Sequence, residues 1–144
     1  MLNFSYPAVF RADEDGRPVV SFPDFPESHT DGKDMQEAME EAIDCLGSTI
    51  SLRMSMKEEI PAPSAPKRGQ RLVPVPLWIA GKLGLYPAMR EKQVSNSELA
   101  RRLGLRETVV RRMLDPEHDS KPGKIEAALA ALGKRVVVAV EDAA

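Results

Sequence analysis

Hydrophobic side chains recur at every second position near the start of the chain, where Leu2, Phe4 and Tyr6 alternate with polar or small residues. This is the period of a half-buried β-strand. A turn ending in glycine follows, and the β-branched run after it predicts a returning strand. The expected order is a strand near 2–6, a turn at 13–16, a strand at 18–22 and a short strand near 28–30.

The next segment changes to the three- and four-residue spacing of an amphipathic helix. Asp34 precedes Glu37 by three residues, as in a capping box, and therefore marks the expected start of this helix. One such helix lying on a small antiparallel sheet buries both apolar faces, which predicts an α+β domain. The expected core positions of the helix are Met35, Ala38, Met39, Ala42, Ile43, Leu46 and Ile50.

A proline-rich segment interrupts this pattern. Three prolines between positions 61 and 66 remove backbone donors and favour extended chain, so we expect a loop at about 60–70. Residues 71–76 resemble an edge strand, where proline is tolerated. If that strand returns to the N-terminal sheet, the first domain has the order βββαβ and covers residues 1–76, and the second covers 77–144.

The rest of the chain has the spacing of an all-α domain. Apolar residues from Leu77 through Met89 predict a helix from which Lys82, Arg90 and Lys92 face outward. Further helices are expected at 96–103, 106–114 and 124–132, and the valine-rich run 136–140 predicts a final strand. Because a lone strand after a helical bundle needs a partner, we expect it to pair with the same strand of a second subunit. This predicts a homodimer or a higher even oligomer.

Residues 96–114 have the features of a helix-turn-helix. Ala100 is small where two helices cross closely, and Gly104 stands where a tight turn needs a positive φ. The apolar residues expected to face the core are Leu99, Leu103, Leu105, Val110 and Met113.

The outward residues of this motif are suited to DNA. Arginine can bond guanine bidentately, and side chains near the start of the second helix would meet base edges in the major groove. Those expected to read bases are Arg106, Glu107, Thr108, Arg111 and Arg112. Those expected to contact phosphates are Arg101, Arg102, Lys121 and Lys124, the last near a helix N-terminus. The alternative is a helical hairpin whose basic face is only solvated.

Charge is distributed unevenly along the chain. Residues 1–66 hold 13 acidic and 5 basic side chains, a net charge of −8, whereas residues 67–144 hold 15 basic and 9 acidic ones, a net +6. Such asymmetry predicts halves with different partners, a polyanion for the basic half and a basic protein for the acidic half. No apolar run approaches the length of a membrane span and no signal peptide is visible, so a cytoplasmic location without membrane contact is expected.

The sequence contains few residues in patterns typical of a catalytic site or a metal site. Cys45 is the single cysteine, and His29 and His118 lie far apart in the predicted organisation, so neither a metal site nor a cofactor is expected. No feature places a nucleophile beside a base, which argues against an enzyme. The segment 22–27 combines two phenylalanines, two prolines and two acids, and it is either a packed turn or an exposed protein-recognition loop.

Several short motifs, taken in order, resemble the HicB-type antitoxins of HicAB toxin–antitoxin systems, in their helix-turn-helix subclass. The N-terminal motifs are VSFPDFPE at 20–27, TDG at 30–32 and the Glu-Ala pairs at 37–38 and 41–42. The C-terminal motifs are LGLY at 83–86, ELARRLG at 98–104 and ALAALGK at 128–134. The resemblance covers nearly the whole chain.

This resemblance implies a partial RNase H-like N-terminal domain that binds and masks a small basic HicA-type mRNA-cleaving toxin. It also implies a dimeric C-terminal domain that represses the toxin–antitoxin operon by binding operator DNA. On charge and expected exposure, the candidate toxin contacts are Asp24, Phe25 and Glu27.

Two other functions compete with this one. The chain could be a transcriptional regulator whose N-terminal domain senses a small ligand, or a metal-dependent nuclease. The nuclease is disfavoured because Asp13, Asp15 and Asp24 fall in predicted loops instead of converging from strands onto paired metal ions.

Overall fold

The chain divides into two compact units, residues 1–80 and 81–144, in a computed structural model that describes residues 3–143. The division falls inside the helix α2 (Leu77–Lys92), beyond the predicted boundary at residue 76. Each unit has a hydrophobic core of its own.

The first unit contains a four-stranded antiparallel sheet in the order β3-β2-β1-β4. Its strands are β1 (Ser5–Ala12), β2 (Pro18–Phe22), β3 (Phe25–Asp31) and β4 (Arg71–Pro74). The central strand β1 pairs with β2 from Val9↔Ser21 to Ala12↔Pro18, and with β4 from Ser5↔Pro74 to Ala8↔Arg71. The predicted order βββαβ and the return of residues 71–74 to the sheet edge are therefore confirmed.

The structure corrects one sequence-based expectation for the sheet and decides between two alternatives for the segment 22–27. The first strand runs over 5–12 instead of 2–6, and Leu2 lies outside the described residues. The segment 22–27 is a packed turn and not an exposed loop, because the Phe22 and Phe25 rings close the ends of β2 and β3 and are both buried.

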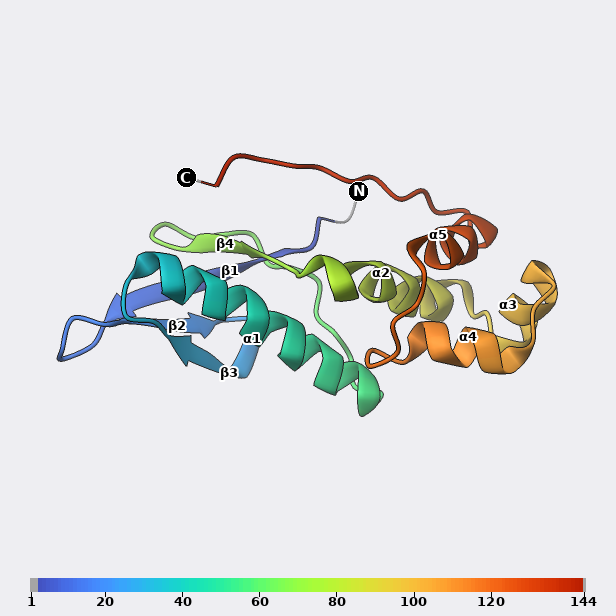
Figure 1. Cartoon of the computed structure of the whole chain (residues 1–144), viewed down its shortest axis with the longest axis horizontal. Coiled ribbons are helices and arrows are strands. Elements are labelled where there is room, and N and C mark those ends of the chain that lie inside the picture. The colour runs from blue at the N-terminus through green and yellow to red at the C-terminus, as the bar shows by residue number, and fades with distance from the viewer. Residues whose placement is uncertain (1–2, 144) are drawn as a thin grey trace. The chain divides into compact units, whose positions relative to one another are not determined.

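The helix α1 (Met35–Ser55) covers one face of the sheet (Figure 1). Its N-cap is the predicted Asp34, whose carboxylate accepts a hydrogen bond from the Glu37 amide at 2.9 Å. Met35 was expected in the core but is 38% exposed, because the first turn of α1 buries only Ala38. The buried residues of α1 are Ala38, Ala42, Leu46, Gly47, Ile50 and Met54.

The second unit is helical and contains the end of α2 with α3 (Asn96–Leu103), α4 (Glu107–Leu114) and α5 (Pro122–Ala131). Ser95 caps α3 by accepting a hydrogen bond from the Glu98 amide at 3.1 Å. The core side chains include Leu85, Met89, Leu99, Ala100, Val110, Met113, Ile125 and Leu129.

In this unit two residues lie differently from their predicted positions, and one predicted strand is unpaired in the described single chain. Lys82 does not face outward but is only 4% exposed, because it lies three residues after Ile79, on the apolar face of α2. Leu105 was expected in the core but is 39% exposed, because it follows the turn at Gly104 instead of lying on a helix. Residues 134–143 run on as an extended tail without strand pairing in this single chain, so their pairing with a second subunit stays a prediction (Figure 1).

Candidate nucleic-acid interface and acidic surface

A tight turn joins two eight-residue helices, α3 and α4, at the centre of the candidate interface. Gly104 adopts φ +64°, in the left-handed region that glycine tolerates best. The Leu105 amide then donates to the Ala100 carbonyl at 2.9 Å and closes α3. Leu99 and Val110 bury their side chains between the two helices, so the turn and the core together fix the direction of α4.

The side chains predicted to read bases lie on the outside of α4. Arg106 is the N-cap of the helix, makes no capping bond with its side chain and is exposed. Thr108, Arg111 and Arg112 are also exposed, and Glu107 is half-buried. The structure therefore brings all five together on one short helix and its N-cap.

Three arginines of α3 and α4 form ion pairs with carboxylates of their own helix. Glu107 accepts from Arg111 Nη2 at 2.6 Å, and Glu98 accepts from both Arg101 and Arg102. The two guanidinium groups lower the pKa of Glu98 to about 2. Because these pairs are exposed, they contribute little to stability and can exchange for other anions.

The predicted phosphate contacts lie at the start of α5 and on α3. Lys121 is the N-cap of α5 and Lys124 lies in its first turn, and both are exposed, as are Arg101 and Arg102. Residues 81–144 carry 12 basic and 9 acidic side chains. The four predicted phosphate contacts are therefore exposed to solvent, two on α3 and two at the start of α5.

The β2–β3 turn, taken here as residues 22–27 and so including the first residues of β3, places the three candidate toxin contacts differently from one another. Phe25 is fully buried, with its ring centroid 4.9 Å from that of Tyr6, so the exposure expected for it is wrong. Glu27 is exposed but accepts two hydrogen bonds from Arg53, at 2.6 and 3.0 Å, which lower its pKa. The Arg53 guanidinium also lies 5.0 Å above the Phe25 ring.

The third candidate, Asp24, is half-buried and joins this turn to the proline-rich segment. Its carboxylate accepts from the amide and the hydroxyl of Ser64, at 3.0 and 3.1 Å. The Tyr6 hydroxyl donates to the Pro61 carbonyl at 2.7 Å, and burial together with the Asp24 charge raises the pKa of Tyr6 to about 12. The predicted loop at 60–70 is thus fastened beside the β2–β3 turn.

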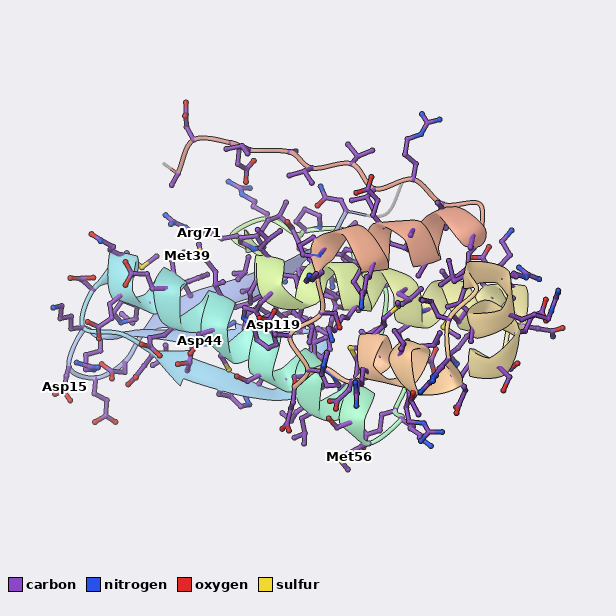
Figure 2. The ribbon with its side chains drawn as sticks, turned by 45° about the vertical axis from the view of Figure 1, so that its right-hand side comes forward. Asp15, Met39, Asp44, Met56, Arg71 and Asp119 are labelled. Carbon is purple, nitrogen blue, oxygen red and sulfur yellow. The ribbon has the colours of Figure 1, made fainter. Side chains whose placement is uncertain are left out.

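Other acids of the first unit are exposed to solvent. Asp44 projects from α1 and Asp15 lies in the turn between β1 and β2 (Figure 2). Glu40 and Glu41 are exposed on α1 as well. With 13 acidic and 8 basic side chains in residues 1–80, this unit presents a surface suited to a basic protein.

Metal-ligating side chains do not gather in the described part of the chain. Among residues 3–143 no group of three or more His, Cys, Asp or Glu could hold a metal ion. Asp13 is used as a turn residue, since its carboxylate accepts from the amides of Asp15 and Arg17. Over the same residues no helix is long and apolar enough to cross a membrane.

Sequence reasoning missed two structural cations. Arg53 connects α1 to the β2–β3 turn, and only its place in the last turn of an otherwise acidic helix could have drawn attention to it. The Lys82 ammonium lies within hydrogen-bond distance of four acceptors inside the second unit. Its position within the apolar run 77–85 is the signal that could have identified it.

Comparison with known proteins connects both halves of the chain to one group. Residues 5–84 match the family model described as HicB_like antitoxin of bacterial toxin-antitoxin system. Antitoxin HicB 2 of Photorhabdus laumondii is 40% identical over 134 residues, which cover 93% of this chain and 94% of that protein. Antitoxin HicB of Pseudomonas fluorescens is 35% identical, with 91% and 90% covered, and antitoxin HicB of Escherichia coli K12 is 34% identical, with 91% and 95% covered.

Proposed function

Since this chain belongs to the family of HicB-like antitoxins of bacterial toxin–antitoxin systems, we propose that it neutralises a HicA-type toxin and represses its own operon. The first unit would hold the toxin, which we take to be a small basic mRNA-cleaving protein, and keep it from its substrate. The second unit would bind operator DNA. In this proposal the chain acts as an inhibitor and a repressor and has no catalytic role.

The observation that carries the DNA-binding proposal is the outer face of α4. Arg106, Thr108 and Arg111 are exposed together on a helix that follows a glycine turn and is supported from behind by a buried core. A helix of this kind can enter the major groove with its first residues against the bases. Helix α4, with its N-cap at Arg106, would then be the recognition helix of a helix-turn-helix.

The carboxylate partners of the arginines suit this role. Arg111 is paired with Glu107 one helical turn away, so its guanidinium is already oriented along the outside of α4. On binding, the exposed pair would exchange for a guanine edge at small cost, since exposed pairs contribute little. Arg101, Arg102, Lys121 and Lys124 would contact phosphates and fix the position of the helix.

The tail after α5 is proposed to make the dimer. Val137, Val138 and Val140 are 65%, 73% and 95% exposed, an arrangement that leaves apolar surface uncovered in a single chain. Pairing of residues 136–140 with the same segment of a second chain would cover these side chains and satisfy the backbone groups of the strand. Two copies would present two recognition helices to a palindromic operator.

The toxin is proposed to dock on the acidic first unit, at and around Asp24 and Glu27. Both carboxylates already accept hydrogen bonds, which hold them in fixed positions at the β2–β3 turn. Phe25 would act from beneath by supporting Arg53 instead of touching the partner. A positively charged toxin would be attracted by the exposed acids of α1 and of the β1–β2 turn.

Two measurements on the full chain test this function. The protein should capture the small basic protein encoded beside it and abolish that protein's RNA cleavage in a stoichiometric titration. It should also bind a duplex from its own promoter more tightly than a scrambled duplex of equal length. Failure to inhibit the neighbouring protein would contradict the antitoxin role, and equal binding to both duplexes would contradict operator recognition.

A further inference from the structure

We propose that Lys82 is a positioning residue for DNA recognition, which fixes the C-terminal end of α4 and thereby the direction of the side chains that α4 presents to a duplex. The proposal rests on the proposed operator binding and adds a residue that lies away from the DNA-facing surface. It follows from where the Lys82 ammonium group is held.

The ammonium group lies where three backbone carbonyls and a hydroxyl converge. An ammonium has only three protons to donate, so four acceptors within reach saturate it. The acceptors of Lys82 Nζ are Arg112 O at 3.2 Å, Asp115 O at 2.6 Å, His118 O at 2.5 Å and Ser120 Oγ at 3.1 Å. One side chain from α2 therefore holds both the end of α4 and the loop that follows it.

Lys82 contacts the carbonyl of Arg112 in the last turn of α4. The last four carbonyls of a helix have no partner within the helix, and a cation there is favoured by the helix dipole. α4 spans only Glu107–Leu114, and the side chain of its N-cap Arg106 makes no capping bond. The amide of the C-cap Asp115 also donates to Arg112 O, so Lys82 adds a second polar contact and is the anchor that connects the end of this short helix to α2.

The environment of Lys82 makes the anchor sensitive to substitution. The side chain is almost fully buried, and burial lowers its pKa while the carboxylates of Asp115 and Asp119 act in the opposite direction. Asp119 lies on the segment between α4 and α5 (Figure 2). Removing the ammonium would take away the donor that His118 O has from Lys82, whereas Arg112 O and Asp115 O would keep the amides of Asp115 and His118. The polar link between α2 and the loop after α4 would be lost, while the apolar contacts between α3 and α4 remain.

A loosened anchor affects sequence recognition more than general DNA affinity. Arg111 and Arg112 belong to the last turn of α4, beside the carbonyl that Lys82 holds. Bidentate contact with a base edge requires a narrow range of positions, whereas contact with a phosphate tolerates movement. Loss of Lys82 should therefore reduce discrimination between operator and other sequences.

The test compares Lys82→Met with Lys92→Met in the full chain. Both variants remove one ammonium from α2 and retain an unbranched side chain, but Lys92 is exposed. Binding to an operator duplex and to a scrambled duplex is measured by fluorescence anisotropy, with helical content followed by circular dichroism. We expect Lys82→Met to bind the operator about tenfold more weakly, or worse, because a buried anchor is lost. Its affinity for the scrambled duplex should match that of Lys92→Met.

Each other outcome has a defined meaning. Unchanged discrimination in Lys82→Met, or an equal loss on both duplexes with the fold intact, would overturn the proposal. If Lys82→Met loses its helical signal, Lys82→Arg decides, because a planar guanidinium keeps the charge but cannot direct three protons to the same point. Reduced discrimination is then expected, and wild-type discrimination in Lys82→Arg would overturn the proposal. A wild-type protein that does not prefer the operator would contradict the proposed function itself.

Discussion

Both units contain an ion pair between arginine and glutamate, but the pair has a different role in each unit. In the first unit Arg53 of α1 reaches Glu27 of β3 and connects elements that are distant in the sequence. In the second unit Arg111 pairs with Glu107 of the same helix, one turn away. The Arg53 side chain is 20% exposed and that of Arg111 is 65% exposed.

This difference separates a structural arginine from one available to a ligand. Arg53 is committed to its own fold, since it also lies over the Phe25 ring and donates to the Glu59 carbonyl. Arg111 can leave Glu107 without disturbing a tertiary contact. In the proposed function, the first unit would offer its acids to a partner and the second unit would offer its bases.

The largest expected effect comes from deleting residues 136–144. The exposed valines are the proposed dimer contact, so the truncated chain should be monomeric in sedimentation experiments. Loss of the second recognition helix should weaken operator binding by about a hundredfold or more, because the two half-sites are no longer bound together. Deletion of residues 141–144 alone is the control and should change neither property. A truncated chain that remains dimeric at micromolar concentration would refute the strand-pairing proposal.

A smaller effect is expected on sequence specificity in the second unit. Arg111→Ala should weaken operator binding by roughly 5- to 150-fold, the range for one bidentate base contact. Arg101→Ala should weaken binding to all sequences alike and reduce the salt dependence by about one counterion. Anisotropy titrations at several salt concentrations distinguish the two. Equal losses with unchanged sequence preference would mean that α4 is not the recognition helix.

A matched pair of variants tests toxin binding by the first unit. Glu27→Gln should weaken toxin capture by about tenfold, since one charged hydrogen-bonding group of the docking surface is lost. Glu14→Gln, in the exposed turn between β1 and β2, removes the same charge away from that surface and should have a smaller effect. Isothermal titration with the toxin measures both, and operator affinity should stay at the wild-type value. Identical toxin affinities in the two variants would show that the docking surface does not include the β2–β3 turn.

The smallest effect concerns acid stability of α3. Hydrogen bonds from Arg101 and Arg102 depress the pKa of Glu98 to about 2 in the folded chain. The stabilisation by this group is therefore complete above its ordinary pKa of 4.5 and is lost as the pH falls through about 2. Thermal unfolding between pH 5 and 2 should show a slight extra decline in the wild type compared with Glu98→Gln. Parallel curves for the two proteins would show that these exposed pairs do not contribute.

Periodicity predicted the elements that depend on local sequence. The capping pair Asp34 and Glu37, the turn at Gly104 and the strand at 71–74 all lie where the sequence placed them, because caps, glycine turns and edge prolines act over a few residues. Phe25 could not be placed this way, since its burial depends on Tyr6 and Arg53, which are distant in the chain.

The candidate site residues also divide into those that local sequence predicts and those whose positions depend on distant residues. Exposure of Arg106, Thr108 and Arg111 followed from the helical period of a short motif. The inward direction of Lys82 did not, because its acceptors come from residues 112–120, which no local pattern connects to α2. Lys82 was therefore misplaced because tertiary structure supplies its partners.

One measurement addresses the central claim, that the two units bind partners of opposite charge. The isotopically labelled full chain is titrated first with operator duplex and then with toxin, and amide chemical shifts are followed by nuclear magnetic resonance. We predict that DNA moves the signals of residues 98–124, with the largest changes in α4, and that the toxin moves signals of α1 and the β2–β3 turn. Operator-induced changes centred on α1, with α4 unaffected, would contradict the account.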